Sequence, residues 1–198
     1  QHPPQPQQGC TFHPLNVLND NPDWSFLPAE LDALVYCPGS INLKPFFFFF
    51  PRDFAADYQL NVVGAVKSIQ AALPSLKAGT QPAIVLFSTV AVGVGMNFHT
   101  QVAASKGAIE GLTRALSAEL APRVRVNCIA PSLTDTPLSA ALLSTPEKRE
   151  ASAQRHPLKR TGTAAEMAAV AQFLISEQAG FITGQVIHAD GGLSAIKA

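Results

Sequence analysis

The stretch VAASKGAIEGLTRALSAELAPRVRVNCIA, residues 102–130, joins a helical pattern directly to a buried strand. Within residues 100–120, apolar or small side chains recur at the spacing of one helix face, namely Ile109, Thr113, Leu116 and Leu120. Residues 124–130 then form a short apolar run that Pro131 ends. A helix that leads into such a strand is typical of an α/β fold with a parallel sheet.

The rest of the chain repeats this alternation. Apolar runs bounded by Pro or Gly predict strands at 31–37, 82–88, 124–130 and 184–190. A fifth strand is expected at residues 11–18, although Pro14 weakens it because proline cannot donate to a sheet ladder. Helical spacing predicts helices at 53–76, 100–120 and 164–176.

Two segments fall outside this alternation. Residues 137–160 contain Pro146 and Pro157, so we expect one or two short, interrupted helices that could act as a mobile lid. The run PFFFFFP at 45–51 has neither helical nor strand periodicity, and it makes sense only when buried in the core or in an interface. The expected organisation is a flexible tail at 1–10 and one domain at 11–198.

Composition excludes several classes of protein. Hydrophobic residues make up 47% of the 198 residues, which favours a globular domain over disorder. Lys+Arg 14 balance Asp+Glu 14, so no net charge attracts nucleic acid or an anionic membrane. The three cysteines form no CxxC pair and suit neither zinc nor disulfides, which favours a reducing, cytoplasmic location and no metal site.

Five pieces of the sequence, in this order, resemble the short-chain dehydrogenase/reductase family. They are LDALVYCPGS (31–40), LNVVGAV (60–66), IVLFSTVA (84–91), VAASKGAIEGLTRALSAELAPRVRVNCIAPSLTDTPL (102–138) and HPLKRTGTAAEMAAVAQFLISEQAGFITGQVIHADGG (156–192). The resemblance implies a Rossmann-like, doubly wound α/β fold with a mostly parallel sheet. It also implies an oxidoreductase that uses NAD or NADP, which the sequence does not distinguish.

The resemblance assigns catalytic roles to Asn61, Ser88 and Lys106, which match the Asn, Ser and Lys of the family's Asn-Ser-Tyr-Lys set. In that set the serine holds the substrate carbonyl oxygen, the tyrosine supplies its proton, and the lysine binds the nicotinamide ribose. The family spacing would favour Thr89 over Ser88, but Ser88 follows the strand directly and is preferred here.

All three residues also have structural alternatives. Ser88 could be a strand-end hydroxyl that satisfies the local backbone. Lys106 could be a solvated surface lysine, but it lies three residues before Ile109 on the apolar stripe, where an unpaired ammonium would be costly. We therefore expect it to point inward and to be held by a bound ribose. Asn61 could equally be a buried amide that caps a helix kink, and the two interpretations remain open.

Val102 stands at the position of the family tyrosine and cannot transfer a proton. A positioned general acid contributes about 10²–10⁴-fold to the rate, so its loss should cripple ordinary ketone reduction without abolishing cofactor binding. His99 and Gln101 are nearby polar candidates to replace it. A surface histidine at the helix start is the more common situation for His99.

The cofactor-binding residues implied by the resemblance lie in several loops. Asn16 and Val17 match the pair beside the adenine, and Gly39 matches the glycine where the backbone approaches the ribose. Pro131, which is followed by serine in place of the family glycine, and Thr136 match the loop beside the nicotinamide. Turn formation alone would also explain several of these residues.

The family's opening strand, Gly-rich turn and helix N-terminus are not found before residue 31. We therefore expect a Rossmann-like domain that lacks its first βαβ portion. Either the sequence is part of a longer chain, or residues 11–18 pair directly with the strand at 31–37.

The resulting hypothesis is an atypical NAD(P)-dependent oxidoreductase that transfers hydride between the nicotinamide and a small carbonyl or alcohol. The alternative is a catalytically inactive scaffold or oligomer subunit with the same fold, and a weaker third idea is reduction of an activated C=C bond. Expected partners are a small-molecule substrate and further copies of the chain, without nucleic acid or membrane. Residues 53–76 and 100–120 resemble the helices that join subunits in the family, which implies a homodimer or homotetramer.

Overall fold

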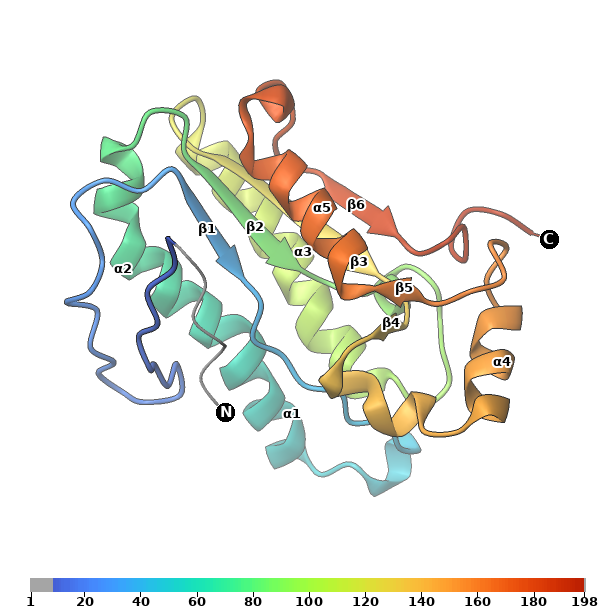
Figure 1. Cartoon of the computed structure of the whole chain (residues 1–198). Coiled ribbons are helices and arrows are strands. Elements are labelled where there is room, and N and C mark those ends of the chain that lie inside the picture. The colour runs from blue at the N-terminus through green and yellow to red at the C-terminus, as the bar shows by residue number, and fades with distance from the viewer. Residues whose placement is uncertain (1–8, 198) are drawn as a thin grey trace.

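The computed structural model describes residues 9–197. Its centre is a parallel sheet of four strands in the order β1-β2-β3-β6 (Figure 1). The strands are β1 (Ala33–Tyr36), β2 (Ala83–Phe87), β3 (Arg125–Pro131) and β6 (Val186–Ala189). The four strands expected from bounded apolar runs are therefore confirmed. Of the tail expected at 1–10, residues 1–8 lie outside the described residues.

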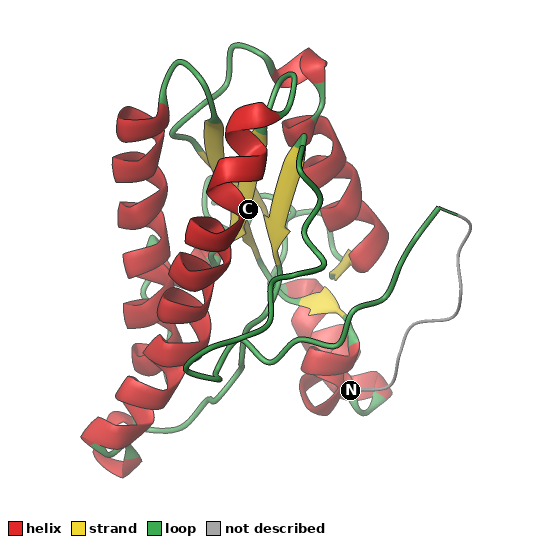
Figure 2. Cartoon of the chain, turned by 90° about the vertical axis from the view of Figure 1, so that its left-hand side faces the viewer, coloured by secondary structure: helices red, strands yellow, loops and turns green. Residues whose placement is uncertain are grey.

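Helices cover both faces of this sheet, so the fold has three layers (Figure 2). The helices of one face are α2 (Gly64–Ala78) and α3 (Thr100–Leu120), and the other face carries α5 (Ala164–Ile175). Because side chains alternate along a strand, Ile84 and Leu86 of β2 pack with α2 and α3, whereas Val85 packs with α5. This is the Rossmann-like arrangement that the sequence predicts.

The helix expected at 53–76 is present but interrupted. It consists of α1 (Pro51–Tyr58), a π-helical turn (Gln59–Val63) and α2, which follow one another without a break in the backbone. In the π-helical turn the N–H of Gly64 bonds to the carbonyl of Gln59, one residue farther back than in an α-helix. The extra residue per turn changes which side chains of this rod face the sheet.

The expected short helices at 137–160 are also present. A 3-10 helix (Pro137–Leu143) is followed by α4 (Pro146–Gln154), and Pro146 occupies the first helical turn, where a missing N–H costs nothing. A two-residue parallel pair joins this region to the start of α5, between β4 (Thr134–Asp135) and β5 (Gly162–Thr163). Further 3-10 turns lie at Phe46–Phe48, Val90–Val92 and Glu177–Ala179.

The strand expected at residues 11–18 is wrong, because this segment forms an irregular loop that ends in a turn. Asn16 makes the turn: its side-chain oxygen accepts from the N–H of Leu18 at 3.0 Å, and its carbonyl accepts from Asn19 at 3.1 Å. Groups committed to a turn cannot join a ladder. Among the described strands, β1 therefore pairs with β2 alone, and its expected pairing with 11–18 does not occur.

The phenylalanine run is mostly exposed rather than buried. Phe46, Phe47, Phe48 and Phe50 are between 57% and 89% exposed, whereas Phe49 packs edge-on against Phe54 of α1.

Within residues 9–197, every helix is too short or too polar to cross a bilayer.

Candidate active site

A cavity of about 800 Å³ opens where the strands of the sheet end. Cys37, Ser88 and Ser132, which follow β1, β2 and β3, line its floor, and α3 and the segment after β3 form its walls. Ligands of open α/β sheets bind outside the carboxyl ends of the strands. The cavity is therefore the candidate active site.

Lys106 of α3 reaches into this cavity from a buried position. The residue is 8% exposed, and its ammonium donates one hydrogen bond of 2.9 Å to the carbonyl of Phe87. Burial lowers the pKa of Lys106 from its ordinary value, while nearby groups that include Asp57 oppose this effect. An ammonium has three N–H donors, so its remaining donors are available to a ligand. The expected inward orientation is confirmed.

Asn61 lies behind the cavity wall, in the π-helical turn. Its amide nitrogen donates 2.9 Å to the carbonyl of Asp57, while its Oδ1 is buried without a hydrogen-bond partner among the described residues. A methyl group placed on Gly39 would lie 3.3 Å from this oxygen and 3.5 Å from the Lys106 ammonium. The Asn61 oxygen, a hydrogen-bond acceptor, and the Lys106 ammonium, a cationic donor, thus both face the space that a side chain at position 39 would fill.

Two adjacent hydroxyls line the cavity beyond β2. Ser88 is buried, and its Oγ donates to a carboxylate oxygen of Glu110 at 2.8 Å. Thr89 caps the following 3-10 turn, where its Oγ1 accepts from the N–H of Ala91 at 3.3 Å. The hydroxyl hydrogen of Ser88 is therefore already used, whereas that of Thr89 is available to a ligand.

Val102 also lines the cavity, one helical turn before Lys106. It is 6% exposed and offers only methyl groups at the position where the family resemblance predicts a tyrosine. His99 immediately precedes α3 and lines the same wall. An imidazole therefore lines the cavity three residues before the position where the family resemblance predicts the phenol.

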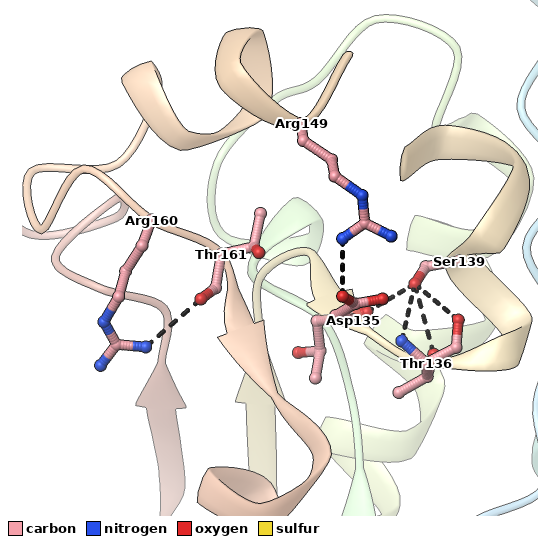
Figure 3. Close-up of polar contacts among 7 residues, drawn as sticks. Asp135, Thr136, Ser139, Arg149, Arg160 and Thr161 are labelled. Atoms are coloured by element: carbon pink, nitrogen blue, oxygen red, sulfur yellow. Dashed lines mark hydrogen bonds and ion pairs between the residues drawn. The ribbon is translucent and has the colours of Figure 1, made fainter. Parts of the chain in front are cut away.

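The segment after β3 forms the opposite wall and includes Pro131 and Thr136. Ser139 fixes its conformation: its Oγ accepts from the N–H of Thr136 at 3.1 Å and donates to the Thr134 carbonyl at 2.6 Å (Figure 3). An ion pair of 2.7 Å between Asp135 and Arg149 ties the same segment to α4. The loop expected to meet the nicotinamide is thus shaped by local contacts.

The structure does not bring every predicted residue to this site. Asn16 is exposed in the turn described above, and Val17 packs on the core near Gly64. Neither residue lines the cavity, whereas Gly39, Ser88, Lys106, Pro131 and Thr136 do.

Sequence reasoning missed three polar groups of the site. Glu110 follows Lys106 by four residues on the buried face of α3, so helical spacing alone could have indicated that it lies near the site. His156 bridges Ser132, 2.8 Å from its Nε2, and the carbonyl of Ser152, 2.8 Å from its Nδ1. Arg155 also lines the cavity. No local pattern predicts the contact between His156 and Ser132, because it joins segments 24 residues apart.

Comparisons with known proteins agree with this architecture. The family model described as Enoyl-(Acyl carrier protein) reductase matches residues 27–194. A tropinone reductase homolog of Arabidopsis thaliana is 37% identical over 171 residues, covering 86% of this chain and 65% of the relative. A 3-oxoacyl-[acyl-carrier-protein] reductase of Thermotoga maritima is 38% identical over 144 residues, covering 72% and 57%. The chain thus spans less than two thirds of these relatives.

Solved structures share the fold. A short-chain dehydrogenase/reductase described as glucose/ribitol dehydrogenase, from Brucella melitensis, superposes with a TM-score of 0.77 and 34% identity, covering 85% of this chain and 66% of that one. A gluconate 5-dehydrogenase of Burkholderia cenocepacia, solved with NADP and tartrate, gives a TM-score of 0.79 and 28% identity with the same coverage.

Proposed function

The chain belongs to the short-chain dehydrogenase/reductase family, and from this we propose that it is an atypical NAD(P)-dependent oxidoreductase acting on a small carbonyl or alcohol. The observation that carries the proposal is the convergence of the Lys106 ammonium and the Asn61 oxygen on the open side of Gly39. A buried cation with spare donors and a buried acceptor without a partner are both costly unless a ligand or water satisfies them.

These residues fit a nucleotide ribose. A ribose hydroxyl both donates and accepts, so it could receive a hydrogen bond from the Lys106 ammonium, and a water beside it could satisfy Asn61. Pro131 and Thr136 would border the nicotinamide on the other wall. A bound reduced nicotinamide supplies hydride to a substrate carbon. The proposal covers NADH and NADPH alike, because the cavity lining favours neither.

Of the two hydroxyls beyond β2, we assign the contact with the substrate oxygen to Thr89. Its hydrogen is available, whereas Ser88 donates to Glu110 and is better placed to support the loop. Thr89→Val should raise KM or lower kcat more than Ser88→Ala does. The opposite order would restore Ser88 to the role expected from the sequence.

A thermal-unfolding titration tests the proposal. A nucleotide at a hundred times its Kd stabilises the folded protein by about 2.7 kcal/mol. We expect NADH or NADPH to raise the midpoint, and Lys106→Met to remove that increase while the protein remains folded by circular dichroism. No shift with either nucleotide would remove the basis for a dinucleotide-dependent enzyme.

A second candidate function is a catalytically inactive scaffold, and Val102 specifically favours it. Binding of nucleotide without turnover of any carbonyl, alcohol or activated C=C substrate would support this candidate. Val102→Tyr then provides a direct comparison, because it adds a phenol one helical turn before Lys106. Carbonyl reduction by Val102→Tyr alone would indicate that only the acid is missing.

We also propose that the chain forms a homodimer or homotetramer in a reducing, cytoplasmic environment. The outward face of α3 carries exposed small residues at helical spacing, Ala104, Gly111, Ala115 and Ala118, which permit close approach of another helix. Cys10, Cys37 and Cys128 are all unpaired, consistent with that environment. Sedimentation as a monomer at micromolar concentration would contradict the oligomer.

A further inference from the structure

Reduction of a carbonyl leaves a negative oxygen that needs a proton, and Val102 cannot supply one. Five titratable side chains among the described residues line the cavity: Cys37, His99, Lys106, Arg155 and His156. If the proposed function holds, one of them or a water molecule must provide the proton. Their environments differ enough to separate them.

Four of the five are poorly suited. The Lys106 ammonium donates to the Phe87 carbonyl, and the proposed function assigns its remaining donors to the ribose. Burial raises the pKa of the Cys37 thiol, which makes it a weaker acid. Arg155 is a guanidinium, which stays protonated in proteins. His156 has both ring nitrogens engaged, with Ser132 and with the Ser152 carbonyl.

His99 differs because one of its nitrogens is free. Its Nδ1 lies 2.7 Å from the carbonyl of Asn97, and since a carbonyl only accepts, Nδ1 carries the hydrogen of that bond. The Nε2 atom has no hydrogen-bond partner within the described part of the chain. The ring is thus oriented by one contact and open at the other end.

The backbone before His99 is in an unusual conformation. Phe98 has φ of 69°, in the left-handed region that a bulky residue seldom adopts. Such conformations persist where the surrounding structure requires them, and they are concentrated at functional sites. Here the turn sets the direction in which α3 begins and therefore the wall on which His99 lies.

The helix places His99 on the same face as the residues of the site. His99 caps α3, and its carbonyl accepts from the N–H of Ala103 at 2.8 Å. Residues seven apart in an α-helix differ by only about 20° around its axis, so this capping position lies near the stripe of Lys106, two turns away. Val102 lies between them, and all three line the cavity. A carbonyl oxygen bound over Val102 would be within reach of groups from both ends of this stripe.

We propose that His99 is the general acid of this site and replaces the tyrosine that Val102 displaces. With a reduced nicotinamide bound, the substrate carbonyl carbon would gain a C–H bond with the electron pair of the hydride, and the C=O π bond would break. The carbonyl oxygen would take the proton from Nε2 of the His99 imidazolium, in which both ring nitrogens carry hydrogen. The carbonyl would be reduced by the two electrons of that hydride, which oxidises the nicotinamide, and the resulting neutral imidazole of His99 would recover a proton from solvent. This inference rests on the proposed function.

The experiment compares His99→Asn with His13→Asn. Asparagine is a favourable residue at a helix start, so His99→Asn should fold. His13 stacks on Phe26 at 4.7 Å, and it does not line the cavity, which makes it the matched control. We expect carbonyl reduction to fall about 10²–10⁴-fold in His99→Asn and to be unchanged in His13→Asn. Nucleotide-induced thermal shifts should be equal in all three proteins.

Two readouts separate proton transfer from a structural role. Added imidazole should restore part of the reduction rate to His99→Ala but not to Lys106→Met. In the wild-type chain without cofactor, diethyl pyrocarbonate should acylate His99 faster than His156, as peptide mass spectrometry would measure. Slower acylation of His99 than of His156 would show that Nε2 is not open and would overturn the proposal.

The outcomes for the two proposals differ. Full activity in His99→Asn would overturn the role of His99 and leave the oxidoreductase proposal intact. Nucleotide binding without turnover in the wild-type chain would overturn the role of His99 and favour the scaffold. Absence of any nucleotide-induced shift would instead overturn the oxidoreductase proposal on which this inference rests.

Discussion

Gly39→Ala tests the nucleotide site with the smallest possible change. The added methyl carbon would lie 3.3 Å from the Asn61 oxygen and 3.5 Å from the Lys106 ammonium, so the fold accommodates it with a shift of a few tenths of an ångström. The backbone of Gly39 is not in the left-handed region, and an alanine there introduces no strain of that kind. The substitution therefore fills the gap without disrupting the sheet.

The expected effects on stability and binding have different sizes. A Gly→Ala change at a compatible position stabilises by about 0.4–1 kcal/mol through the unfolded chain, which offsets the tight contact. Hydrogen bonds to a charged group are worth about 1.5–3 kcal/mol each. If the methyl group excludes one such bond between Lys106 and a ribose, Kd should rise about 10- to 150-fold.

Isothermal titration calorimetry with NADH and NADPH measures the Kd, and urea unfolding measures the stability. Gly95→Ala is the matched control, because its added carbon would meet no atom within 4 Å. An unchanged Kd in Gly39→Ala would refute the reasoning that a ligand occupies this gap. A large loss of stability would show instead that the gap is part of the packed interior.

Three further outcomes follow from the packing and the ion pairs. Gly64→Ala should lose about 1–3 kcal/mol in urea unfolding, because its added carbon would lie 2.3 Å from the Tyr36 hydroxyl oxygen. Thr163→Ala should lose about 1 kcal/mol in the same assay, because Thr163 caps α5. Hydrogen bonds from Arg160 lower the pKa of Glu166 to about 2, so this contact stabilises the fold above pH 4.5, the ordinary value for glutamate, and loses its effect between pH 4.5 and 2. Acid unfolding of Glu166→Gln should lack that component, and an unchanged acid profile would contradict it.

The elements that the sequence predicts well are those with a strong local signal. The helix expected at 100–120 is observed as Thr100–Leu120, because its apolar stripe packs on the sheet as the 3.6-residue period requires. The buried strands are equally clear, since each apolar run ends at proline, glycine or a polar turn. Lys106 was predictable for the same reason, because its spacing from Ile109 placed it on the inward stripe.

The remaining features depend on contacts that local sequence does not contain. The apolar residues at 11–18 resemble a strand, but Asn16 forms a turn within this segment. Whether Ser88 or Thr89 offers its hydroxyl depends on Glu110, 22 residues from Ser88. Asn61, whose Oδ1 has no hydrogen-bond partner among the described residues, lies in the π-helical turn, which the expected continuous helix at 53–76 did not include.

The π-helical turn at Gln59–Val63 gives this chain an unequal sensitivity to sequence change. The turn holds one residue more than an α-helical turn, so a deletion within it can be absorbed by a return to α-helical winding. A deletion within α2 would instead rotate α1 by about 100° and shift it by about 1.5 Å relative to the rest of α2. Asp53, whose carbonyl receives a 2.6 Å hydrogen bond from Gln101, would then leave the start of α3. A one-codon deletion within the π-helical turn should therefore leave α1 in place, whereas the same deletion within α2 would misalign two walls of the cavity at once.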